Sequence, residues 1–265
     1  MTEERWTVTG PQTLELDDVA SLAVYCVDGR VDVVAHDEPV TRVEIHAVDG
    51  RALEVRLGDD GHLVVGHETL VDWKRFADSF RSYTGRARAD VHIAVPRAVP
   101  ITLGMVKGDA FLAGARARAS AHTVSGAVMV TDVTGPLDVN SVSGEVTVSG
   151  HHGDVGINTV SGGVTVTGWV DDVDTNTVSG AVTLDLYDQP RLVRSNAVSG
   201  SLLVRLPDAS AVDARLTGLG GRLVVGGVEA RGFGTKVLRP DGAAATRLEA
   251  TALTADVTVI AREPR

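Results

Sequence analysis

Two groups of side chains in this sequence have the residue types that metal binding or acid catalysis would need. The first is HHGD, at residues 151–154, which places two imidazoles beside a carboxylate, a donor set that a metal ion could use. Adjacent residues on a turn rarely converge on one ion, and no second ligand pair stands at a fixed spacing from this one. We therefore expect a solvated turn at 151–154 and no metal site.

The second group is a pair of carboxylates, Asp154 and Asp172, which stand eighteen residues apart. Two acids about 5 Å apart could hydrolyse a glycosidic bond. No aromatic platform or further base accompanies them, so solvation on an outer face explains them better. The single cysteine, Cys26, lies in the alternating segment LAVYCVDGRVDVV and is best interpreted as a buried strand residue. Since GxSxG and Walker sequences are also missing, we expect no enzyme activity and no cofactor.

The composition restricts the possible partners. Of 265 residues, 43% are hydrophobic and 23% are charged, which is typical of a folded protein. A formal net charge of -10 argues against sequence-independent binding to nucleic acid. The opening MTEERWTVTGPQ has no apolar run, and no stretch approaches the eighteen apolar residues of a membrane span. With one cysteine, these features favour a cytoplasmic protein without a membrane span.

An internal repeat organises the elements that must position these side chains. The glycines of the VSG triplets, at Gly126, Gly144, Gly162 and Gly180, are eighteen residues apart, and Gly200 follows after a two-residue insertion. Apolar residues alternate before and after each triplet, which is the signature of strands. The alternation falls on odd positions before the triplet and on even positions after it, so a bend must lie within NSVSG.

Stacking of equivalent coils about 4.8 Å apart would explain every residue of the motif. We expect Val142 to join the core and the serine and glycine of each triplet to form a tight corner. We expect the asparagines to form an amide ladder in which each side chain donates to the next. The predicted structural ladder consists of Asn140, Asn158, Asn176, Asn196, Ser143, Gly144, Ser161, Gly162, Ser179 and Gly180.

The predicted fold is therefore all-β: a single-stranded parallel β-helix, or β-solenoid, with coils of about eighteen residues. We expect one domain over 1–265. Its predicted parts are diverged N-terminal coils or a cap at 1–66, a helical insertion at 69–85, regular repeats at 100–225, and a loop with the C-terminal coil at 226–262.

The segment TLVDWKRFADSFRSYTGRARAD interrupts the strand pattern. Apolar residues recur there at a spacing of three to four, which predicts a short amphipathic helix near 70–83. This helix could simply pack on the flank or end of the solenoid. Because aromatic and arginine side chains are enriched at interfaces, it is also a candidate partner face. The residues of that face are Trp73, Phe76, Phe80, Arg81 and Tyr83.

The recurring NTVSGxVTV, the early VDGRVDVV and the closing LEATALTADVTVI resemble bacterial β-strand-repeat proteins of a putative-adhesin family, a domain of unknown function. The resemblance covers roughly residues 20 to 260, without the segment near 70–83. It implies a β-helical fold with no established catalytic residues. Many members of that family carry a membrane anchor or an export signal.

Three functions are compatible with these features. The first is a non-enzymatic scaffold or protein-interaction module. The second is a self-assembling solenoid whose open strand edges meet in a polymer. The third is a carbohydrate-active β-helix enzyme that would use Asp154 and Asp172. The first fits best, because stacking accounts for the whole repeat and leaves no chemistry unexplained.

Overall fold

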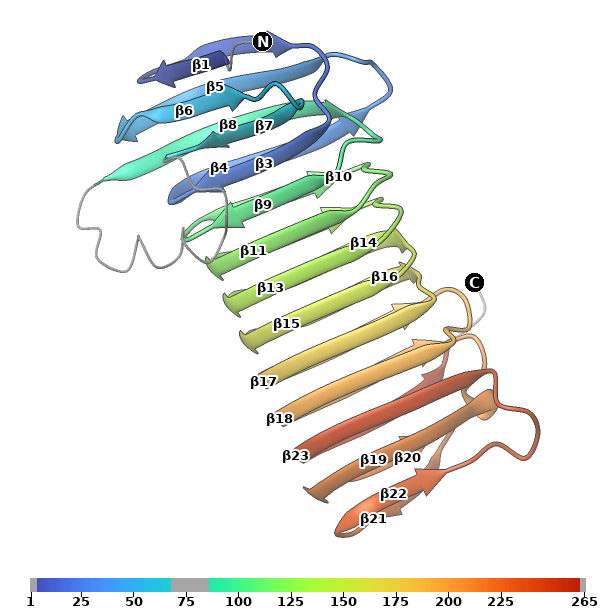
Figure 1. Ribbon diagram of the computed structural model, residues 1–265. Coiled ribbons are helices and arrows are strands. Elements are labelled where there is room, and N and C mark those ends of the chain that lie inside the picture. The colour runs from blue at the N-terminus through green and yellow to red at the C-terminus, as the bar shows by residue number, and fades with distance from the viewer. Residues whose placement is uncertain (1–3, 68–85, 263–265) are drawn as a thin grey trace. The chain divides into compact units, whose positions relative to one another are not determined.

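The computed structural model describes residues 4–67 and 86–262 (Figure 1). Contacts divide the chain into two compact units, Met1–Gly135 (unit 1) and Pro136–Arg265 (unit 2). The described residues form 23 strands and a 3-10 turn at Ala209–Ala211, with no α-helix among them. The prediction of an all-β, mostly parallel fold is confirmed. The helix predicted near 70–83, within 69–85, lies outside the described residues, and no described helix could cross a membrane.

Unit 2 is built from parallel coils in which one run of strands leads into a second run. The first run pairs β13, β15 and the first halves of β17, β18 and β23, and continues to β19 and β22. The second run pairs β14, β16 and the second halves of β17, β18 and β23, and continues to β20 and β21. The bounds are β13 (Leu137–Ser143), β14 (Val146–His152), β15 (Val155–Ser161), β16 (Val164–Trp169), β17 (Asp172–Leu186), β18 (Leu192–Leu206), β19 (Val212–Gly220), β20 (Arg222–Val225), β21 (Val228–Arg231), β22 (Gly234–Leu238) and β23 (Thr246–Ala261).

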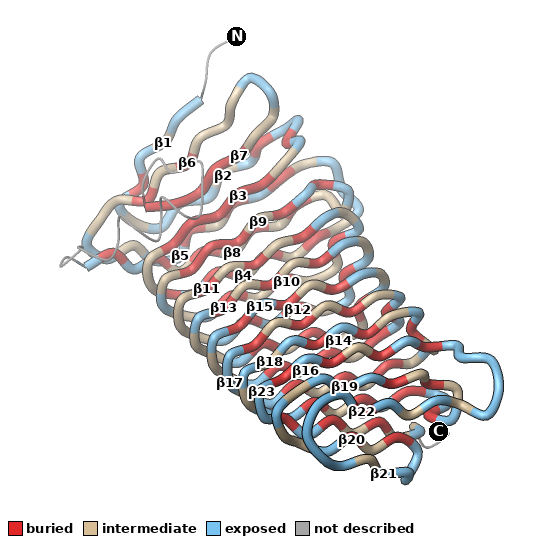
Figure 2. The backbone as a smooth tube through the Cα atoms, turned by 60° about the horizontal axis from the view of Figure 1, so that its bottom comes forward, coloured by how far each residue is buried: buried red, intermediate tan, exposed pale blue. Residues whose placement is uncertain are grey.

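The register of unit 2 places like residues on like residues. Val146 pairs with Val164 and Val164 with Val182, each eighteen residues further along the chain. These valines are at most 3% exposed, and Figure 2 shows buried and exposed residues alternating along the strands. Complete burial of one such side chain contributes roughly 1.5–3 kcal/mol, so the stacked columns supply the core that no single coil could form.

The order of coils in unit 2 differs from the order in the sequence. β23 is the last strand of the chain, yet it pairs with β18 on one side and with β19 and β20 on the other. Ala255 lies opposite Gly200 in this register and takes the place of the corner glycine. The strands at the end of the unit are instead β21 and β22, which pair antiparallel with β20 and β19. The C-terminal copy is therefore inserted into the stack rather than added to its end.

Unit 1 contains the same kind of displacement. One run of strands has the order β1, β6, β7, β3, β9, β11, and the other has the order β2, β5, β8, β4, β10, β12. The coil of β3 and β4 thus lies between that of β7 and β8 and that of β9 and β10, and antiparallel strands form the end of the unit. The bounds are β1 (Glu4–Val8), β2 (Gln12–Leu16), β3 (Ser21–Cys26), β4 (Asp28–His36), β5 (Thr41–Gly50), β6 (Leu53–Leu57), β7 (His62–Gly66), β8 (Ala87–Pro96), β9 (Ile101–Met105), β10 (Asp109–Ala113), β11 (Ala119–Ser125) and β12 (Val128–Thr131).

Candidate functional site

The corners at Gly162 and Gly180 in unit 2 require glycine. Gly162 has φ +118°, and a Cβ built on it would lie 1.9 Å from the carbonyl oxygen of Gly144 in the preceding coil. Gly180 repeats the arrangement, with φ +141° and 2.1 Å to the carbonyl oxygen of Gly162. Positive φ and so close a backbone approach exclude any side chain. Beside this corner, the Ser161 hydroxyl donates to the carbonyl oxygen of Val142 at 3.3 Å, and the Ser179 hydroxyl makes the equivalent bond to Val160 at 3.5 Å.

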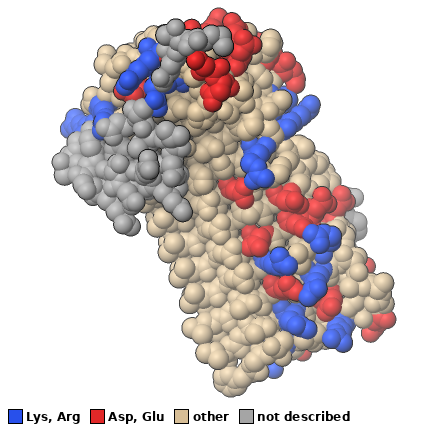
Figure 3. All heavy atoms as spheres, in the orientation of Figure 1, with Lys and Arg blue, Asp and Glu red and all other residues tan. Residues whose placement is uncertain are grey.

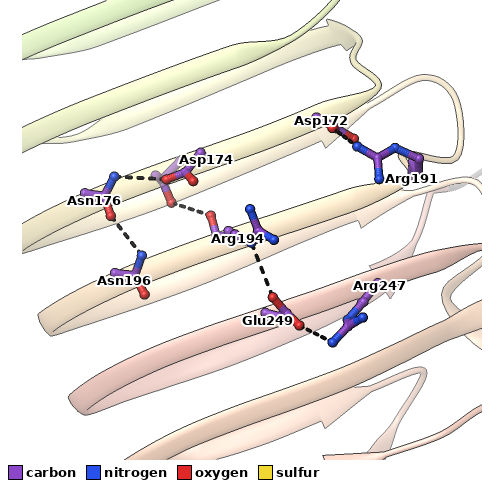
Figure 4. A network of polar contacts seen from close by, with 9 residues as sticks. Asp172, Asp174, Asn176, Arg191, Arg194, Asn196, Arg247 and Glu249 are labelled. Atoms are coloured by element: carbon purple, nitrogen blue, oxygen red, sulfur yellow. Dashed lines mark hydrogen bonds and ion pairs between the residues drawn. The ribbon is translucent and has the colours of Figure 1, made fainter.

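The asparagines form a continuous ladder along the outer face of the first run of strands. Nδ2 of Asn158 donates to Oδ1 of Asn140, Nδ2 of Asn176 to Oδ1 of Asn158, and Nδ2 of Asn196 to Oδ1 of Asn176, each at 2.9 Å. Asn176 also donates to Oδ1 of Asp174 at 2.9 Å (Figure 4). Each ladder bond uses one of the two N–H groups of an amide, so a second donor remains on most of these side chains.

The valines before the corner serine lie on the surface, and the expectation that Val142 joins the core is wrong. Val142 is 47% exposed, because the inward face changes phase at the bend and this residue falls on its outer side. The register continues this column onto β23 and β19, where leucine replaces valine. The resulting apolar column consists of Val142, Val160, Val178, Val198, Leu253 and Leu219, every one of them exposed.

Charged residues occupy the neighbouring columns on the other side of the asparagines. Arg194 donates to Glu249 at 3.3 Å, and Arg247 approaches the same carboxylate at 2.5 Å (Figure 4). The hydrogen bond from Arg194, with the positive charges of Arg247 and Arg194, holds the pKa of Glu249 below its ordinary value. On the face of unit 2 visible in Figure 3, charged side chains gather on one side and leave the rest uncharged. The ladder and the apolar column together thus form a neutral face.

The HHGD sequence does not form a metal site, and the two imidazoles point to different surroundings. His151 is fully buried, with Nε2 3.2 Å from the carbonyl oxygen of Asp154, so the expectation of a solvated turn fails for this residue. The ring of His152 stacks on Trp169 with a centroid separation of 4.3 Å. No group of metal-ligating side chains occurs within 4–67 and 86–262.

The two aspartates considered for glycoside chemistry do lie on neighbouring coils, since Val155 pairs with Val173. However, Asp172 forms an ion pair with Arg191. The guanidinium of Arg191 engages a carboxylate oxygen that a nucleophile or general acid would have to present to a substrate. The arrangement therefore gives no support to acid catalysis.

An aromatic column on unit 2 is absent from the sequence-based candidates. Trp169 contacts Tyr187 edge to face at 4.6 Å, and the guanidinium of Arg262 lies 4.1 Å from the centroid of the Tyr187 ring. The spacing of His152, Trp169 and Tyr187, 17 and then 18 residues, is the signal that could have revealed it. Of the predicted partner face, Trp73, Phe76, Phe80, Arg81 and Tyr83 lie outside the described residues.

The sequence pattern of the Toastrack DUF4097 family matches residues 21–218, which is most of the chain. The chain belongs to this family. It is a domain of unknown function, and the predicted resemblance to it is confirmed. No curated protein matches the sequence of this Toastrack chain.

Solved structures of low identity are also similar to this Toastrack chain. A putative adhesin from Bacteroides fragilis has 9% identity and a TM-score of 0.48, with 94% of this chain and 97% of that chain covered. A protein from Parabacteroides distasonis, named a putative lipid binding protein, has 13% identity, a TM-score of 0.45 and coverage of 95% and 94%. A putative cell adhesion protein from Clostridium sporogenes has 9% identity, a TM-score of 0.23 and coverage of 95% and 100%.

Proposed function

We propose that this Toastrack protein is a non-enzymatic interaction module that binds a protein partner through the neutral face of unit 2. The observation that carries the proposal is the apolar column, in which six aliphatic side chains lie exposed on successive coils. Stacking explains the corner glycines and the asparagine ladder, but it gives no reason for exposed valine and leucine. Contiguous exposed apolar residues on a folded protein are typical of interaction sites.

Removing water from the neutral face also costs little free energy. The charges of Arg194 and Glu249 lie on the far side of the asparagine column, so a partner that covers the valines need not bury them. The amides of Asn158 and Asn196 each use one N–H group in the ladder and keep a second donor for a partner. A partner with apolar side chains beside exposed backbone groups, such as a loop or a strand, matches this chemistry.

Photo-crosslinking from inside the face tests the proposal. A benzoylphenylalanine residue is introduced at Val160, at Val178 or, as a control, at the partly exposed Thr165 in β16, and the chain is irradiated in its native cells. We expect one protein adduct of the same mass from the first two positions and none from Thr165. Equal adducts from all three positions, or none from any, would contradict the proposal.

A paired variant separates binding from folding. In the double variant Val160→Lys with Val178→Lys, both charges lie on the surface, so we expect the unfolding midpoint to stay unchanged. The protein identified by crosslinking should no longer copurify with this variant. Thr165→Lys with Thr183→Lys places the same charges on the second run of strands and should retain the partner. The segment 69–85 stays a second predicted face, and its deletion should leave this binding intact if the neutral face is sufficient.

A further inference from the structure

The amides of the asparagine ladder do not use their N–H groups alike. Nδ2 of Asn176 donates to Asn158 and to Oδ1 of Asp174, at 2.9 Å each, so both of its N–H groups are bonded. Asn158 and Asn196 each donate one bond along the ladder, and no acceptor within the described residues bonds their second N–H group. Both of these side chains are exposed, whereas Asn176 is half-buried. The ladder therefore offers a partner two free donors with a fully bonded amide between them.

The residue two positions before each asparagine explains this difference. It lies on the same face of the strand as the amide, because side chains alternate between the two faces. Before Asn176 this residue is Asp174, whose carboxylate accepts the second N–H group. Before the other two amides it is Gly156, which has no side chain, and Arg194, which is itself a donor. The neighbouring column thus determines which amides stay available.

The two free donors have a spacing that selects among partner conformations. They stand two coils apart, since β15 pairs with β17 and β17 with β18. Adjacent coils lie about 4.8 Å apart, so the donors are separated by about 9.6 Å. A polyproline II helix has three residues per turn and repeats its carbonyl groups about every 9.3 Å. Residues on one face of a β-strand repeat about every 6.7 Å, and an α-helix repeats about every 5.4 Å, so neither matches.

The hydrogen-bonding polarity of the face also suits a polyproline II segment. Such a helix has no internal hydrogen bonds, so its carbonyl groups are available to accept from the amides. Proline carries no backbone N–H and needs no acceptor from the face. The exposed side chains of Val160, Val178 and Val198 lie beside the donors and give prolyl rings an apolar surface to cover. Donors face acceptors and apolar groups face apolar groups, with no charge on either side.

Phe233 adds an aromatic ring at the end of the apolar column. It is 91% exposed. The register of β19 and β22 pairs Gly218 with Gly234 and so brings Phe233 beside Leu219, the last leucine of the column. Aromatic side chains line the sites at which many domains bind polyproline II segments. The column thus ends in the kind of side chain on which a prolyl ring packs.

We propose that the partner of the neutral face is an uncharged, proline-rich segment that lies along unit 2 in the polyproline II conformation. Two of its carbonyl groups, three residues apart, accept hydrogen bonds from Asn158 and Asn196, and its prolyl rings cover the apolar column. A helical or β-strand partner would leave one of the two donors without an acceptor. This inference rests on the proposed function and names the class of partner that the same face binds.

Nitrogen-15 NMR of the purified chain tests the inference directly. The probe is a synthetic peptide of repeated Ala-Pro-Pro units with blocked ends, and the control is a Gly-Ser peptide of the same length. We expect the Ala-Pro-Pro peptide to move the side-chain amide signals of Asn158 and Asn196 at least twice as far as those of Asn176. The Gly-Ser peptide should move none of them. Equal shifts with both peptides, or no shift of the two free amides, would overturn the inference.

A substitution beside the ladder tests the role of the free donors. Gly156→Asn supplies an amide oxygen next to Asn158, as a carboxylate does at the bonded amide, and should weaken binding of the Ala-Pro-Pro peptide at least fivefold. The nearest atom to a Cβ there is Oδ1 of Asp138, at 3.0 Å, which is the end of a side chain. Gly163→Asn is the control, since a Cβ at Gly163 meets nothing within 4 Å, and it should keep the wild-type affinity. A folded Gly156→Asn chain that binds like the wild type would refute the role of Asn158.

The crosslinked adduct from native cells separates this inference from the proposed function. The segment attached to benzoylphenylalanine at Val160 is identified by mass spectrometry after digestion, and we expect it to be rich in proline. Attachment to a segment without proline would overturn the inference but leave the neutral face as a binding site. A chain that gives no adduct in cells, yet binds the Ala-Pro-Pro peptide through Asn158, would contradict the proposed function and still support this chemistry of the face.

Discussion

The corner-glycine column and the apolar column of unit 2 repeat with the same spacing but for different reasons. A side chain at Gly162 would overlap the backbone of the preceding coil, so the fold itself demands glycine there. Val160, two residues earlier, is 47% exposed and could be replaced by a polar residue without disturbing the stack. A repeated residue is therefore evidence of a structural requirement only where it is buried or conformationally constrained. The asparagine column lies between these cases, since its side chains are accessible but bonded to one another.

The largest expected effect comes from the glycine column. Gly162→Ala should destabilise the protein by about 3 kcal/mol or more, because it combines a strained positive φ with a backbone overlap. Gly163→Ala is the matched control, since a Cβ there would meet nothing within 4 Å. Urea unfolding followed by circular dichroism measures both, and similar midpoints for the two variants would erase the distinction between the columns.

The second largest difference in stability is expected between substitutions of the two valines that flank the corner, Val160 and Val164. Val164→Ala removes buried methyl groups and should lower the free energy of unfolding by about 2 kcal/mol. Val160→Ala removes exposed ones and should change it by less than about 0.5 kcal/mol. A loss at Val160 as large as that at Val164 would mean that the apolar column serves stability, and the case for a binding face would weaken.

The pH dependence of stability should be affected by the buried His67 of unit 1. The glycine, valine and asparagine columns of unit 2 carry no titratable group and should not contribute to it. Burial, followed by the nearby charge of Arg51, lowers the pKa of His67 to about 4 from the ordinary 6.5. The folded state therefore disfavours the protonated ring, and stability that is complete above pH 6.5 is lost as the pH falls toward 4. His67→Asn keeps an acceptor for the Val27 amide, which the His67 ring provides at 3.3 Å.

Between pH 7.5 and 5, the wild-type chain should lose about 1 to 2 kcal/mol more stability than His67→Asn. Unfolding curves at each pH measure the difference. Parallel losses in the two chains would show that another group causes the acid sensitivity. Asn158→Ala, which changes no titratable group, should follow the wild-type pH profile.

Substitutions in the asparagine ladder should have smaller effects than those at Gly162 and Val164, and these effects should be graded. Asn158→Ala loses two exposed hydrogen bonds and should destabilise the protein by about 1 kcal/mol. Asn176→Ala should be worse, because Asn176 also bonds Asp174. Asn196→Ala should be milder, since its one amide bond in the ladder is to Asn176. An equal effect at all three positions would indicate that the amide bonds contribute little.

The ends of the units contrast with the regular coils. The coils of β15 and β17 repeat one register along the ladder, whereas β21 and β22 turn antiparallel and expose Phe233. In the regular coils, each strand edge is paired with the next coil. A terminal strand has no next coil, so its outer edge and the side chains beside it stay accessible.

Much of the fold follows from the sequence because its signals are local. Alternating valines predict strands, glycine tolerates the positive φ of a corner, and an eighteen-residue spacing predicts coils in register. The asparagine spacing likewise implies that Asn140 and Asn158 are neighbours, as their 2.9 Å hydrogen bond requires. Whether Val142 faced the core could not be read in this way, because the alternation changes phase at the bend and the motif does not say at which residue.

The sequence by itself determined that the chain forms strands, where each coil turns and which residues stack. Only the tertiary structure decided the order of the coils, the burial of His151 and the exposure of the apolar column. The physical reason is that copies of one motif offer the same apolar stripe, so β23 fits between β18 and β19 as well as it would fit an end. Its position depends on long-range pairing, to which every part of the stack contributes and which no local pattern encodes.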